Sequence, residues 1–287
     1  MIGNTPMIKL EKLTQNNNTI FAKLEGQNPG GSIKDRIALN MIKEGEKVGA
    51  LTKHKTIIEA TSGNTGIGIA LVGAIKGYKT MIVMASNMSE ERKKIIRSFG
   101  AKLVETDPKQ GTDGAILRVK EIVKSNPKKY WMPNQFQNIN NPMTHYKYTA
   151  NEIIEQVPNV SVLVAGMGTS GTLMGLSKKL KEYNPNIKII GIEPEKQHKI
   201  SGLKNMTESI VPGIYKKEKL DKTIIVKTSE AYKTTRLLAK EHGLFVGISS
   251  GAALFGALKF AKQKSSEKIV VIFPDRGEKY LSSDLFK

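Results

Sequence analysis

The 287-residue sequence contains no cysteine, and this absence excludes several kinds of chemistry. A chain without cysteine has no disulfide, no thiolate metal site, no iron–sulfur cluster and no catalytic thiol of its own. Any sulfur chemistry must therefore use the sulfur of a substrate. The four histidines also lack metal-ligand spacing such as H-E-x-x-H, so we predict no metal site; they are His54, His145, His198 and His242.

Long apolar runs are absent as well. No run approaches the roughly twenty apolar residues that a membrane-spanning helix needs. The opening stretch MIGNTPMIKL lacks the apolar centre and the small-residue cleavage site of a signal peptide. A content of 39% hydrophobic residues is still enough to bury a core in one large domain or two smaller ones. We therefore expect a globular cytoplasmic protein with no membrane partner.

Acidic residues are few relative to basic ones, which gives a formal net charge of +19. Such a charge is compatible with nucleic-acid binding when the basic residues cluster beside aromatic rings. Here the lysines are scattered through predicted helices and only 6% of residues are aromatic. We therefore predict no specific nucleic-acid partner, and expect the positive field to attract anionic substrates instead.

Short β-branched runs alternate with helix-period stretches along the whole chain. The predicted strands are 19–24, 56–59, 80–84, 102–105, 160–165, 187–192, 223–227 and 268–273. The predicted helices are 33–47, 66–76, 89–99, 112–124, 144–157, 171–181, 229–242 and 250–264. This alternation predicts an α/β fold with mostly parallel sheets, in which ligands bind where loops leave the carboxyl ends of strands. A long loop over 195–215 is also expected to be functional.

The loop "EATSGNTG" at 59–66 follows a predicted strand and precedes a helix. Its small and hydroxyl residues can bind an anion at the helix N-terminus, or they can simply cap the helix. The sequence leaves both interpretations open.

The loop "GMGTSGT" at 166–172 has the same placement and fits G-x-G-x-x-G. With Glu193 at the end of the next strand, it is compatible with a Rossmann-type dinucleotide-binding protein. Its extra hydroxyl groups, from Thr169, Ser170 and Thr172, suit a terminal phosphate monoester better. Spacing alone does not decide between these ligands.

The stretch "GISSG" at 247–251 matches the nucleophile elbow of α/β-hydrolases, with Ser249 as the nucleophile. Those enzymes place their histidine after the serine, and no histidine follows His242. Chain order therefore excludes the hydrolase interpretation and leaves a helix cap as the simplest alternative.

The stretch "NPGGSIKDR" at 28–36 places Lys34 after two glycines, at the start of a predicted helix. A cation is disfavoured there by the helix dipole, so we expect the pKa of this amine to be lowered, as a nucleophile or a Schiff base requires. The spacing does not match a P-loop.

Five stretches, "IGNTP", "NPGGSIKDR", "EATSGNTG", "GMGTSGT" and "GISSGAA", resemble in order the fold-type II pyridoxal-phosphate enzymes of the cysteine synthase and cystathionine β-synthase family. The resemblance extends from Ile2 to Phe286. The runs "NMSEERK", "NPMTHY" and "DRGEKYLS" are most similar to cysteine synthase B.

The resemblance implies a role for each matching residue. Lys34 would be the catalytic residue and would bind pyridoxal 5'-phosphate covalently. The other cofactor-binding residues would be Asn64 at the ring oxygen, Ser249 at the ring nitrogen, and a phosphate cradle of Gly168, Thr169, Ser170, Gly171 and Thr172. The substrate carboxylate would bind to Thr61, Ser62, Gly63, Thr65 and Gln135.

The resemblance also implies a reaction and an architecture. The reaction would be β-replacement on O-acetyl-L-serine through an α-aminoacrylate, with sulfide giving L-cysteine or thiosulfate giving S-sulfocysteine. Cystathionine β-synthase or an O-phosphoserine-dependent synthase are the alternatives. We expect a homodimer whose subunits have an N-terminal segment (1–35), a small mobile domain (36–130) and a large domain (131–287), with the cofactor between the two domains.

Overall fold

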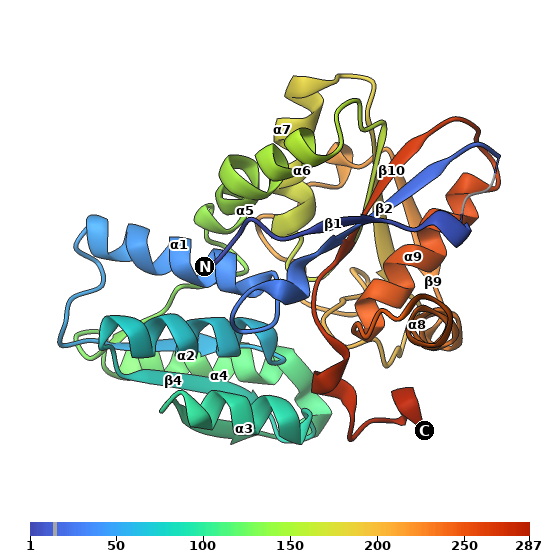
Figure 1. The fold of residues 1–287 in the computed structure, drawn as a ribbon. Helices are drawn as coiled ribbons and strands as arrows, with labels where there is room; N and C mark the ends of the chain where they lie inside the picture. The colour runs from blue at the N-terminus through green and yellow to red at the C-terminus, as the bar shows by residue number, and fades with distance from the viewer. Residues whose placement is uncertain (14–15) are drawn as a thin grey trace.

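The computed structural model describes residues 1–13 and 16–287, which form two β-sheets covered by helices (Figure 1). The larger sheet has the order β1-β2-β10-β7-β8-β9, and the smaller has the order β5-β4-β3-β6. The larger contains β1 (Met7–Lys9), β2 (Thr19–Leu24), β7 (Val162–Gly166), β8 (Lys188–Pro194), β9 (Lys222–Val226) and β10 (Lys268–Phe273). The smaller contains β3 (Thr56–Ala60), β4 (Thr80–Ala85), β5 (Lys102–Thr106) and β6 (Tyr130–Trp131).

All eight predicted strands are present, and the fold is α/β as predicted. The neighbouring strands pair in parallel with one exception, β1, which pairs antiparallel with β2. Neither β1 nor β6 was predicted. They have three and two residues, and a run that short carries no period-two pattern.

The helices are α1 (Lys34–Lys47), α2 (Asn64–Lys76), α3 (Glu90–Ser98), α4 (Gly111–Ser125), α5 (Asn140–Thr144), α6 (Ala150–Gln156), α7 (Gly171–Tyr183), α8 (Thr228–His242) and α9 (Ile248–Ala261). A five-residue π-helical segment, His145–Thr149, joins α5 to α6. The single helix predicted over 144–157 is therefore a composite that begins earlier, at Asn140. Over the described residues, no helix is long and apolar enough to cross a membrane.

Each sheet is the middle of three layers. Along β7, Val162 and Val164 face the core shared with α8 and α9, whereas Leu163 and Ala165 face the core shared with α6 and α7. This alternation is that of a strand covered by helices on both faces. The smaller sheet has α1, α2 and α3 on one face and α4 on the other, and every residue of its strand β4 is buried.

The chain visits the larger sheet twice. It begins there with β1 and β2, builds the smaller sheet, and returns at β7, so that β2 lies beside β10 in Figure 1. Ala38 and Ile42 of helix α1 belong to the hydrophobic core of the smaller sheet. The predicted boundaries after residues 35 and 130 lie near these crossings, and the division into domains stays a prediction.

Candidate active site

A cavity of about 550 Å³ lies where loops from the two sheets meet. Its walls come from the loops that follow the carboxyl ends of β3, β7 and β8, and from the start of α1. All but two of the predicted site residues line it: Lys34, Thr61, Ser62, Asn64, Thr65, Gln135, Gly168, Thr169, Ser170, Thr172 and Ser249. The two exceptions, Gly63 and Gly171, lie in the same loops and shape them.

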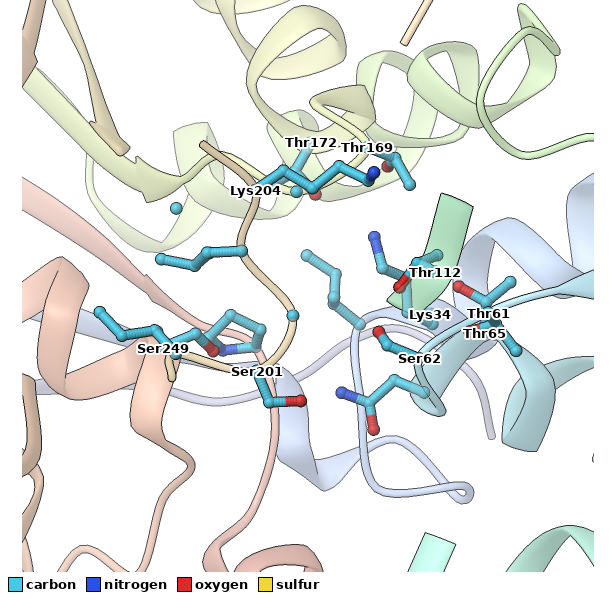
Figure 2. A pocket seen from close by; sticks show the side chains of 18 of the residues that line it. Lys34, Thr61, Ser62, Thr65, Thr112, Thr169, Thr172, Ser201, Lys204 and Ser249 are labelled. Atoms are coloured by element: carbon cyan, nitrogen blue, oxygen red, sulfur yellow. The ribbon is translucent and has the colours of Figure 1, made fainter. Parts of the chain in front are cut away.

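Lys34 is the first residue of α1 and extends into this cavity (Figure 2). The turn before it is fixed by the Ile33 N–H, which donates to the carbonyl of Pro274 at 2.9 Å. Burial lowers the pKa of Lys34 to about 8. The direction agrees with the expectation from sequence, and the cause is the removal of water from around the buried amine. A larger share of neutral amine makes Lys34 a better nucleophile and base near neutral pH.

The 61–65 loop turns sharply at Gly63, whose φ is +144°. A Cβ at this position would lie 2.2 Å from Cδ of Arg92, so glycine is needed for both the backbone conformation and the space. Gly63 is also the N-cap of α2, so the N-cap residue has no side chain that could cap the helix. The hydroxyl group of Thr61 accepts the N–H of Gly63 at 2.9 Å and keeps its own O–H to donate, and both Thr61 and Ser62 line the cavity. This arrangement favours the anion-binding interpretation over the capping one.

Gln135 is held against this loop from three directions. Its Nε2 donates to the carbonyl of Ala60 at 2.9 Å, and its Oε1 accepts from the Thr65 hydroxyl at 2.6 Å. Its backbone N–H donates to the buried carboxyl group of Glu59 at 3.0 Å. Burial raises the pKa of Glu59 to about 7. Two of the five predicted carboxylate-binding residues, Thr65 and Gln135, which are 70 positions apart, are thus in direct contact.

The fit of the predicted phosphate cradle to an anion can be judged from its buried polar atoms and its glycines. The hydroxyl oxygen of Ser170 is buried and has no hydrogen-bond partner among the described residues. Ser170 has φ +68° and immediately precedes α7, whose first backbone N–H groups are free to bind an anion. A Cβ on Gly168 would lie 2.4 Å from the carbonyl oxygen of Gly202, so only glycine allows the long loop to approach. These features fit a phosphate monoester.

Ser249 is the second residue of α9 and is 4% exposed, and it borders the same cavity. Figure 2 shows it across the cavity from Lys34, with the segment that carries Ser201 and Lys204 between them. A hydroxyl group here suits a ring nitrogen. The cavity thus brings together the Lys34 amine, two loops whose hydroxyl and backbone groups suit anions, and the buried Ser249 hydroxyl.

The family model described as pyridoxal-phosphate dependent enzyme matches residues 1–275 of this chain. A cysteine synthase of Aquifex aeolicus is 48% identical to it, over 100% of this chain and 90% of the relative. Cysteine synthase B of Escherichia coli is 40% identical, over 99% of this chain and 94% of the relative. The chain belongs to the pyridoxal-phosphate-dependent cysteine synthase family.

Solved structures agree with this family. An O-acetylserine-dependent cystathionine β-synthase from Helicobacter pylori superposes with a TM-score of 0.95 at 39% identity, covering 100% of this chain and 97% of the other. A cysteine synthase from Entamoeba histolytica superposes with a TM-score of 0.93 at 42% identity, covering 99% and 88%. The fold is therefore that of fold-type II enzymes, and the cofactor of this enzyme is pyridoxal phosphate.

Glu193, which a dinucleotide site would place at a ribose, has a different role in this enzyme. Its carboxylate accepts the N–H of Met206 at 2.7 Å, so it anchors the long loop and does not line the cavity. The geometry therefore does not support the Rossmann-type interpretation.

Sequence analysis missed two contributors to the site. Arg92 of α3 is 3% exposed, donates to the Ser201 hydroxyl at 2.6 Å and stacks on the ring of Tyr280. Asn141 donates to the carbonyl of Gln135 at 2.8 Å and to the hydroxyl of Thr169 at 3.2 Å, linking the two anion sites. Both residues lie in the runs "NMSEERK" and "NPMTHY", which carried the family resemblance. The neighbouring residues in those runs do not indicate which distant side chains Arg92 and Asn141 contact.

Residues 198–204 of the predicted long loop also line the cavity. The Lys204 amine donates to the Asp113 carboxylate of α4 at 2.9 Å, which ties the loop of the larger sheet to a helix of the smaller one. A Cβ on Gly171 would lie 1.9 Å from Oδ1 of Asn141, which explains why this position in the cradle is glycine.

Proposed function

We propose that this enzyme forms L-cysteine by β-replacement, using O-acetyl-L-serine and sulfide. The observation that carries the proposal is the convergence on one cavity of Lys34, with its lowered pKa, and the unpartnered Ser170 hydroxyl. Around them lie the hydroxyl groups suited to an α-carboxylate. The same proposal includes thiosulfate as a second sulfur donor, which would give S-sulfocysteine.

The cofactor would be held at three points. Lys34 would bind it covalently, the cradle from Gly168 to Thr172 would bind its phosphate at the start of α7, and Asn64 would donate to its ring oxygen. When bound, pyridoxal phosphate supplies an electron sink that makes the substrate α-proton acidic and lets a β-substituent leave. Ser249 offers the ring nitrogen a neutral hydroxyl group, which does not enforce its protonation. Such a moderate sink suits elimination.

Lys34 would also move the proton. The free amine of Lys34 would take the α-proton of the bound substrate, and acetate would leave from the β-carbon. After addition of the sulfur nucleophile to that carbon, Lys34 would return the proton to the α-carbon. A pKa of about 8 suits both halves of this cycle, because the amine exchanges its proton readily near neutral pH.

The substrate carboxylate would be bound by the loop from Thr61 to Thr65. Backbone N–H groups at the start of α2 and the hydroxyl groups of Thr61 and Ser62 are donors suited to a carboxylate. The contact of Thr65 with Gln135 would keep the loop in shape. This site would orient the α-carbon toward Lys34.

An anionic sulfur donor would enter a cavity with a positive wall. Arg92, Lys199 and Lys204 line it together with Lys34. This charge favours thiosulfate as well as the hydrosulfide ion. The choice of O-acetylserine is supported by the name of one solved structure, the O-acetylserine-dependent cystathionine β-synthase from Helicobacter pylori.

The test is a panel of donors and acceptors read by mass spectrometry of the products. O-acetylserine, O-phosphoserine and serine are each paired with sulfide, thiosulfate and homocysteine. Cysteine from O-acetylserine and sulfide is expected to form fastest, with S-sulfocysteine from thiosulfate second. Cystathionine as the main product, or a preference for O-phosphoserine, would instead assign one of the alternative activities.

Lys34→Ala serves as the active-site control in this panel and is expected to lose turnover with every pair. Lys12→Ala, on an exposed 3-10 helix away from the cavity, is its matched control.

We also propose that the enzyme is a cytoplasmic homodimer, as its family resemblance implies. Sedimentation velocity measures the mass, and a monomer at micromolar concentration would contradict the dimer.

A further inference from the structure

Lys279 is a buried cation whose three N–H bonds are all used. It lies in the 3-10 helix Gly277–Tyr280 near the end of the chain and is 4% exposed. Its amine donates to the carbonyl oxygens of Gly30 and Gly31 at 3.0 and 2.9 Å, and to Oδ1 of Asn64 at 3.0 Å. Three acceptors satisfy the three donors of an ammonium group.

Two of these acceptors belong to the turn that leads into Lys34. Gly31 has φ +76°, and a Cβ there would lie 3.2 Å from Nζ of Lys279. The same turn is joined to the C-terminal segment by the β-bridge between Ser32 and Asp275. Lys279 therefore completes the contact between the chain end and the residues that carry the catalytic lysine.

The third acceptor fixes the amide of Asn64. Its Oδ1 accepts from Lys279, and its Nδ2 donates to Oδ2 of Asp275 at 2.7 Å. An ammonium group can only donate and a carboxylate can only accept, so these two partners allow one orientation of the amide. After both bonds are made, the amide nitrogen keeps one N–H. Because Asn64 borders the cavity, that N–H is the donor its side chain has left to offer a ligand.

We propose that Lys279 is a positioning residue of the cofactor site, which holds the Asn64 amide so that an N–H and not its carbonyl oxygen is presented to the cofactor ring oxygen. The inference rests on the role of Asn64 in the proposed function. A flipped amide would set its oxygen against an oxygen that carries negative charge, which is repulsive, whereas an N–H donor stabilises that charge. The specificity for a donor therefore comes from a residue that lies 215 positions away in sequence.

The experiment measures cofactor retention by the loaded enzyme on dilution, and the absorption spectrum of the bound cofactor. In Lys279→Met we expect roughly tenfold weaker retention, the size typical of losing one charge-assisted hydrogen bond. The absorption band should shift as well, because the ring oxygen loses a donor. Measurements are made at pH 7, below the Lys279 pKa of about 8, where the ammonium form dominates.

A double-mutant cycle separates positioning from general stability. If Lys279 acts through Asn64, then Lys279→Met combined with Asn64→Ala retains cofactor no worse than Asn64→Ala alone. Lys93→Met is the matched control: Lys93 is also 4% exposed and makes three hydrogen bonds, to Ser86, Glu90 and Glu105, and none of these four residues lines the cavity. It should lower thermal stability without moving the absorption band. Lys279→Arg keeps the charge and N–H donors and should restore most of the retention.

The outcomes are distinct. A shifted band, weaker retention and a non-additive cycle support the proposal. If Asn64→Ala loosens the cofactor but Lys279→Met does not, or if the two effects add, the proposal is wrong while the proposed function stands. If Asn64→Ala retains cofactor as well as the unmodified enzyme, the role of Asn64 fails, and the proposal with it. Should Lys279→Met not fold, Lys279→Gln is measured instead, because glutamine keeps an N–H donor without the charge. An unshifted band and unchanged retention in Lys279→Gln would overturn the role of the charge.

Discussion

The lowered pKa of Lys34 predicts how fast the enzyme takes up its cofactor. Only the neutral amine attacks an aldehyde, and burial moves the pKa of Lys34 from 10.5 to about 8. At pH 7 about one tenth of such an amine is neutral, against about 0.03% for a lysine in water, so the attacking form is roughly 300-fold more abundant. Attachment should therefore be fast at neutral pH and become independent of pH above about 8.

The assay is stopped-flow absorbance after apoprotein is mixed with pyridoxal phosphate, between about pH 6 and 10. Below the pKa the logarithm of the rate should rise with unit slope, and it should level off near pH 8. A rate that keeps rising beyond pH 9.5 would refute the reasoning, because it would mean that water still reaches the amine. Burial also brings the pKa of Lys279 to about 8, so the profile is repeated in Lys279→Met, where the plateau should begin at the same pH.

Two further variants test the framework of the site. Gly168→Ala places a Cβ 2.4 Å from the Gly202 carbonyl oxygen, so we expect at least tenfold weaker cofactor retention by titration. Gly49→Ala, at a glycine that lies outside the cavity and whose added Cβ would meet no atom within 4 Å, should leave retention unchanged. Arg36→Met removes the partner of the buried Glu25 carboxylate, whose Oε2 lies 2.6 Å from the arginine Nε. We expect a loss of about 3–5 kcal/mol in the free energy of unfolding, measured by urea denaturation, and a loss below 1 kcal/mol would contradict this assignment.

The regular elements were predictable because most of them carry their own pattern. Strand β4 is apolar along almost its whole length, as expected of an interior parallel strand, and its position follows directly from the sequence. The edge strands β1 and β6 carry no such signal, because they have only three and two residues, and β6 pairs with β3 from a distant part of the chain. The π-helical turn at His145 likewise interrupts a stretch whose periodicity indicated one continuous helix.

The site was predictable as a set of loops but not as a set of contacts. Chain order and the resemblance identified the residues that face the cavity, since those lie at strand ends and helix starts. The bonds that hold them in place depend on distant residues of ordinary type. Lys279 is one of 45 basic residues, and what distinguishes it is its set of contacts with the turn before Lys34 and with Asn64, which no local pattern predicts.

The return of the chain to its first sheet has a consequence for biosynthesis. Strand β2 pairs with β10, so this part of the larger sheet can form only after Lys268, the partner of Thr19, has been synthesised. The smaller sheet uses only residues between 56 and 131 and can assemble while translation continues. The turn before Lys34 is bonded to Pro274 and Asp275, which are synthesised about 240 residues after it. Lys34 therefore leaves the ribosome long before the residues that complete its surroundings.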